Sequence, residues 1–149
     1  LQDNALFADV FDAITNEDAC VRMRASDAIE KVSRVCPQKL QPFKNELINV
    51  VSKIEQQEVR WHVAQMLPRL ALEESEIAQI VHLLTSWVDN SKSNIVKVNS
   101  LQSLVDLAET YIEYKPFVKA KIEELMVFGS AAIRSRGKKL LKTLNKPKD

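Results

Sequence analysis

One pattern constrains the fold more than any other: an aliphatic residue followed directly by a base recurs four times along the 149-residue chain. The aliphatic residues are spaced by 38, 37 and 37 positions. Further apolar or small residues follow each one at offsets of four, eight and eleven, and these offsets share one face of a helix. A recurring pattern of this length predicts an array of helical repeats. The four opening pairs are Val21-Arg22, Val59-Arg60, Val96-Lys97 and Ile133-Arg134.

Four other amphipathic stretches lie between these helices, so that the chain alternates first and second helices of a pair. We expect first helices over about 4–15, 40–54, 74–88 and 115–127. Polar turns separate each first helix from the second one, at 16–18, 55–57, 90–94 and 128–130. The chain has only two glycines, Gly129 and Gly137, whereas folds rich in β-turns use glycine for positive φ angles. The prediction is therefore an all-α fold of about eight antiparallel helices.

The period, the paired helices and the Val-Arg dipeptide that opens the second helix resemble HEAT repeats. The resemblance covers one domain, residues 1–149, in four repeats of about 4–35, 40–72, 74–111 and 115–145. It implies an armadillo-like α-α superhelix, a solenoid in which each helix pair buries its apolar face against its neighbours. Whether the chain is a piece of a longer array stays open. Four residues would then be expected to expose apolar surface: Leu6, Phe7, Leu140 and Leu144.

The resemblance also implies a polar ladder between repeats, formed by an Asp in the turn of each pair and the base that opens the second helix. The basic position is occupied by Arg22, Arg60, Lys97 and Arg134. The acidic position is occupied only once, by Asp18, and is taken by Gln56, Ser93 and Ser130 in the later repeats. Within the second repeat, Pro68 is expected to kink its helix or to end the regular hydrogen bonding of that helix.

Charge and cysteine content place weaker limits on the partners and the location of the protein. The formal net charge is +1, so no overall field draws the chain to nucleic acid or to a membrane. Cys20 and Cys36 are expected at opposite ends of one helix, about 24 Å apart, which is beyond the reach of a disulfide. Free thiols favour a reducing compartment, and we expect a cytoplasmic protein. The longest apolar run, residues 80–88, is too short to cross a membrane.

The sequence carries no motif that specifies catalysis. His62 and His82 are the only histidines, and no Cys/His spacing is typical of a zinc site. No P-loop, Rossmann fingerprint, nucleophile elbow or kinase signature occurs. We therefore expect neither enzymatic activity nor a cofactor or metal. The alternative is a nucleic-acid-binding protein, similar to the DNA glycosylases for damaged bases that are built from HEAT-like repeats. Its candidate residues would be Trp61, Arg69, Asp106 and Arg136.

The favoured function is that of a scaffold whose concave helix face binds a protein or peptide. Residues at offsets 3, 6 and 10 from each opening aliphatic residue point away from the buried face. An aromatic beside histidine and arginine has the composition of a protein-binding hot spot. The candidate partner-binding residues are Arg24, Trp61, His62, Gln65, Arg69, Asn99 and Gln102. Their structural alternative is an ordinary solvated face, with Arg69 and Asp106 in water.

The last helix is basic whereas the first is acidic. Residues 1–18 hold five acids and no base, and residues 134–149 hold seven bases and one acid. The basic helix has three interpretations: a solvated helix end, a polyanion-binding site, or a surface that meets the acidic start of a second copy. We therefore expect a monomer or a weak head-to-tail association, with nucleic acid as the less favoured partner. The candidate polyanion-binding residues are Arg136, Lys138, Lys139 and Lys142.

Overall fold

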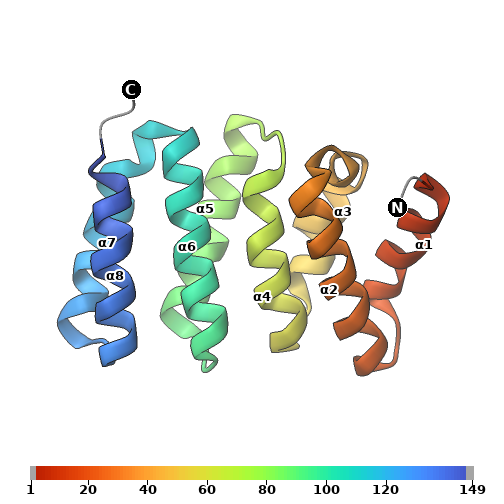
Figure 1. Cartoon of the computed structure of the whole chain (residues 1–149), viewed down its shortest axis with the longest axis horizontal. Helices are drawn as coiled ribbons and strands as arrows, with labels where there is room; N and C mark the ends of the chain where they lie inside the picture. The colour runs from red at the N-terminus through yellow and green to blue at the C-terminus, as the bar shows by residue number, and fades with distance from the viewer. Residues whose placement is uncertain (1–2, 147–149) are drawn as a thin grey trace. The chain divides into compact units, whose positions relative to one another are not determined.

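The chain folds into helices only, within residues 3–146, which the computed structural model describes. Eight α-helices are α1 (Asn4–Asp12), α2 (Ala19–Val35), α3 (Lys44–Asn49), α4 (Gln57–Met66), α5 (Glu74–Asn90), α6 (Asn94–Thr110), α7 (Lys115–Phe128) and α8 (Ala131–Leu144) (Figure 1). Five short 3₁₀ helices are η1 (Ala13–Thr15), η2 (Pro37–Phe43), η3 (Val51–Lys53), η4 (Leu67–Arg69) and η5 (Ile112–Tyr114). The all-α prediction is confirmed. No helix in this part of the chain is long and apolar enough to cross a membrane.

The polar turns begin the second helices as their composition predicts. Asp18, Ser93 and Ser130 each cap a helix, because a side-chain oxygen accepts hydrogen bonds from backbone N–H groups of the first turn. Gln56 precedes α4 but makes no such cap. Its side chain makes contacts with α2 instead.

Two compact units divide the chain, 1–83 and 84–149, and the division falls inside α5. In the first unit α2 and α4 run side by side (Figure 1), and α2 also packs on α1, η1 and η2. The expected face of α4 and of the 3₁₀ turn that follows it is buried throughout, since Val59, Val63, Leu67 and Leu70 are at most 4% exposed. The corresponding face of α2 begins one turn later than expected, because Val21 is 37% exposed whereas Ala25 and Ile29 are buried.

The stretch expected as one helix over 40–54 is broken into η2, α3 and η3. Proline has no N–H to donate, and Pro42 lies inside η2, so α3 begins only at Lys44. The ring of Phe43 fills the space beside α1, at 5.6 Å from the ring of Phe7 and 4.4 Å from that of Phe11. Pro68 has the expected effect, because α4 ends at Met66 and a 3₁₀ turn follows.

In the second unit α6 packs on both α7 and α8, which also pack on each other (Figure 1). Gly137 lies where α8 meets α7: a Cβ atom there would lie 2.7 Å from Met126 Cγ and 3.2 Å from Ile122 Cγ2. The missing side chain therefore permits close helix packing. Of the four residues expected to reveal an uncovered end, Leu6 is 46% exposed, and Phe7, Leu140 and Leu144 are buried.

A candidate partner-binding face on α2 and α4

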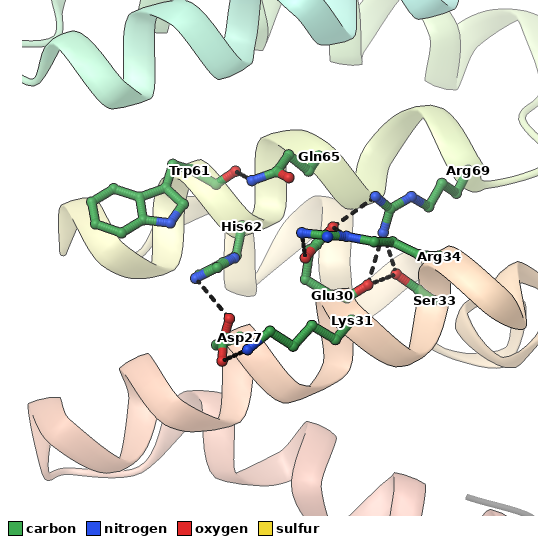
Figure 2. Close-up of polar contacts among 9 residues, drawn as sticks. All are labelled: Asp27, Glu30, Lys31, Ser33, Arg34, Trp61, His62, Gln65 and Arg69. Carbon is green, nitrogen blue, oxygen red and sulfur yellow. Dashed lines mark hydrogen bonds and ion pairs between the residues drawn. The ribbon is translucent and has the colours of Figure 1, made fainter.

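Seven polar or amphipathic side chains form one surface of the first unit, which we call the α2–α4 face. The helical spacing of these residues turns them away from the apolar core. Figure 2 shows most of them beside a second set of polar groups, which consists of Glu30, Ser33 and Arg69. The face consists of Arg24, Asp27, Lys31 and Arg34 from α2, and Trp61, His62 and Gln65 from α4.

A buried carboxylate, Glu30, lies beneath this face with its side chain wholly inaccessible to solvent. Arg34 holds both of its oxygens, with Nε–Oε1 and Nη2–Oε2 distances of 2.8 and 2.6 Å. Arg69 Nη2 donates to Oε1 at 2.7 Å, and its Nη1 donates to the Glu30 carbonyl and to Ser33 Oγ. Burial alone would raise the pKa of Glu30, but the two guanidinium groups outweigh burial and lower this pKa. Glu30 is therefore a charged link between α2 and η4.

Arg69 is not the solvated side chain that its offset suggested. It is only 22% exposed, and its guanidinium is committed to Glu30 and Ser33. A charged side chain at the edge of an apolar face is drawn inward when an opposite charge is buried beside it. Glu30 itself was missed in the sequence. Its spacing to Arg34 is the i,i+4 pattern of a helical ion pair, and that pattern could have drawn attention to it.

His62 is the second group inside the face. Its side chain is 12% exposed, and its Nε2 lies 3.7 Å from Asp27 Oδ1. Lys31 Nζ holds the other Asp27 oxygen at 2.8 Å. Burial lowers the pKa of His62, and the nearby charges of Asp27 and Glu30 oppose that effect without reversing it. The ring is therefore neutral near pH 7.

Nδ1 of His62 is buried and has no hydrogen-bond partner within residues 3–146. Buried polar atoms are satisfied in the large majority of cases, so this nitrogen is an exception among the described residues. Trp61 adjoins it, with the two ring centroids 5.6 Å apart and the planes tilted by 57°. The Trp61 side chain is half-buried, and the Gln65 amide donates to the Trp61 carbonyl at 3.2 Å.

The remaining candidate residues are distributed as follows. Arg24 is exposed on α2. In the second unit, the Asn99 amide donates to the Ile95 carbonyl of its own helix. Gln102 donates to Asp106 and accepts from Arg136 at 2.8 Å, so it joins α6 to α8. Arg136 is thus half-buried, whereas Lys138, Lys139 and Lys142 are exposed.

Two residues at the positions of the implied ladder, Arg22 and Gln56, contact each other in the first unit. Arg22 Nε donates to Gln56 Oε1 at 2.8 Å, and Gln56 Nε2 donates to the Ala19 carbonyl at 2.9 Å. Asp18 accepts backbone N–H groups of α2 as its cap. The guanidinium of Arg22 therefore bonds to the neutral Gln56, at a position where the resemblance would place an aspartate.

Comparison with protein-family models, with curated proteins and with solved structures gives no match to this chain. Within residues 3–146, no three Cys, His, Asp or Glu side chains are grouped so that they could hold a metal ion. The two cysteines are free thiols, Cys20 on α2 and Cys36 just after it.

Proposed function

We propose that the chain is a non-catalytic interaction module that binds a protein or peptide on the α2–α4 face. The observation that carries the proposal is the pair of Trp61 and His62. A half-buried indole offers a large apolar surface at low entropic cost, and it adjoins the His62 ring, whose buried Nδ1 has no hydrogen-bond partner among residues 3–146. Interfaces place most of their binding energy in such aromatic anchors.

The groups around this pair are held in place before any partner arrives. Glu30 fixes Arg34 from below, and Lys31 is tied to Asp27 by an i,i+4 ion pair. Side chains that are already ordered lose less entropy on binding, which supports a preformed surface. We expect the backbone of α2 and α4 to change little on binding.

The same contacts favour binding over catalysis. Glu30 is wholly buried and paired with two guanidinium groups, so its carboxylate is poorly placed to meet a substrate. Arg69, which the glycosylase alternative would need on the surface, directs its donors at Glu30 and Ser33. We therefore favour an interaction module over a base-excision enzyme.

We further propose that the helix pairs form a HEAT-like superhelix. The support is the period of 37–38 residues, together with polar contacts about one period apart, such as Arg22 of α2 with Gln56, which directly precedes α4. A cytoplasmic location is proposed on the two free thiols, which a reducing compartment would preserve.

Selection of displayed peptides tests the proposed binding. Short random peptides on phage are enriched on the immobilised protein, and affinities of the enriched peptides are measured by fluorescence anisotropy. Truncating a hot-spot aromatic costs about 2 kcal/mol or more, so Trp61→Ala should weaken binding roughly thirtyfold. His62→Ala should weaken it as well.

The matched control is His82→Ala, because His82 is an exposed histidine on α5 in the same unit. It should leave the affinity unchanged, and circular dichroism should show that all variants keep their helix content. Enriched peptides that bind Trp61→Ala and the wild type equally well would refute the proposed face.

A further inference from the structure

The exposed surface of α8 carries a row of bases without acidic partners. Arg134, Lys138 and Lys142 are all exposed and are spaced by four residues, so they form one stripe along the helix. No acidic side chain among residues 3–146 forms an ion pair with any of the three. Unpaired like charges along one helix repel each other, and an acidic surface would relieve that repulsion.

Helix α1 carries side chains of the opposite sign, although Lys39 of η2 contacts its first turn through Asn4 Oδ1. Asp9 and Asp12 are exposed on α1 and form no ion pair within the described residues, and no base occurs between Asp3 and Asp18. Asp3 and Asp18 cap α1 and α2, but Asp9 and Asp12 have no such structural task. The pair is therefore available for a cationic partner.

Exposed apolar side chains lie on, or just before, the helices that carry these charges. Phe128 is 90% exposed and Val127 is 67% exposed, just before the start of α8. On α1, Leu6 is 46% exposed and lies one turn before Asp9. A protein surface can cover these side chains, whereas a phosphate backbone would leave them in water.

We propose that α1 of one copy docks on the α8 surface of a second copy, with Asp9 and Asp12 against Lys138 and Lys142. The two surfaces differ, so the contact is heterologous and each copy keeps one of them free for a further copy. Exposed ion pairs are individually weak and screened by salt, so the association is weak and ionic-strength dependent. This contact uses none of the residues of the α2–α4 face.

Charge reversal with a compensating mixture tests the contact by sedimentation velocity at ~0.01 M salt, where the Debye length is about 30 Å. Two variants are made, Asp9→Lys/Asp12→Lys and Lys138→Glu/Lys142→Glu. Each alone should lose at least tenfold in self-association, because its like-charged surfaces now repel. The equimolar mixture should regain association, since each variant then complements the other. In about 1 M salt, the wild type should dissociate.

The control Lys53→Glu/Lys92→Glu reverses two exposed lysines outside α8, and it has the same net charge as the α8 variant. It should associate as the wild type does. A wild type that is monomeric at all concentrations in low salt overturns the proposal, and so does a mixture that associates no better than its components. A third outcome also overturns the proposal: at ~0.15 M salt the wild type shifts a DNA duplex in a gel and the α8 variant does not, while the two self-associate equally. That result would assign α8 to polyanion binding.

Discussion

Replacing Arg69 by methionine tests whether the buried charge of Glu30 organises the first unit. Methionine keeps most of the aliphatic volume of the arginine, so the change removes mainly the guanidinium. Three hydrogen bonds are lost: two to the Glu30 carboxylate and carbonyl, and one to Ser33. The carboxylate then stays buried, with Arg34 as its remaining cation.

The expected loss of stability is reduced because Arg34 still pairs with the Glu30 carboxylate. Breaking a buried ion pair by removing one partner costs about 3–5 kcal/mol, because the other charge is left uncompensated. Arg34 retains its two hydrogen bonds of 2.8 and 2.6 Å to the carboxylate, which places Arg69→Met near the lower limit, at about 3 kcal/mol. The matched exposed pair gives the contrast: Lys31 is 63% exposed beside Asp27, and Lys31→Met should cost at most about 0.5 kcal/mol.

Urea unfolding measures these costs. Trp61 reports on the first unit in a Trp87→Phe background common to all variants. The double variant Glu30→Leu/Arg69→Met should be more stable than Arg69→Met alone, because it no longer buries an unpaired charge. An Arg69→Met cost no larger than that of Lys31→Met would refute the reasoning, and so would strictly additive effects of the two substitutions.

Three further predictions concern other buried groups. Because burial lowers the pKa of His62, the unfolded chain binds its proton first on acidification. Stability should therefore fall as pH drops through 6.5, the ordinary pKa of histidine, and His62→Gln should flatten that fall in urea unfolding at a series of pH values. Gly137→Ala should stabilise the fold by less than the ~1 kcal/mol expected from helix propensity, because the new Cβ would meet Met126. In a Met126→Ala background, thermal unfolding should show a larger stabilisation by the same substitution. Lys121 is 9% exposed and bonds to Asp89 and Glu124, so Lys121→Met should cost about 1–2 kcal/mol near neutral pH. Although burial opposes it, these two carboxylates raise the pKa of Lys121, and the stability difference from the wild type should therefore close as pH rises above 10.5.

Periodicity predicted those parts of the fold that depend on local pattern. The face of α6 is one example, since Val96, Ser100, Leu104 and Leu107 are all buried as their offsets require. A helix whose apolar residues recur every three to four positions can bury them in only one orientation. Proline signals were equally local, and Pro68 ended α4 as expected.

The candidate site was less accessible to this reasoning, because its decisive contacts join residues far apart in the sequence. The burial of Glu30 depends on Arg69, 39 positions later, and hydropathy assigns both to the surface. The expected helix over 40–54 failed for a local reason, because Pro42 lies inside η2 and α3 begins only at Lys44. The ring of Phe43 packs against α1 at this break.

Polar contacts that involve the second-helix segments nevertheless have sequence separations close to the period of 37–38. Arg22 meets Gln56 across 34 positions, Gln102 meets Arg136 across 34, and Glu30 meets Arg69 across 39. Each separation differs from the period of 37–38 by about one helical turn or less, as expected when side chains of neighbouring segments meet slightly out of register. For the second-helix segments of this chain, these three contacts place polar partners at the period plus or minus about one turn. For Glu30, this separation indicates Arg69 rather than the helical neighbour Arg34. Arg69 is the residue that joins η4 to the Glu30 carboxylate.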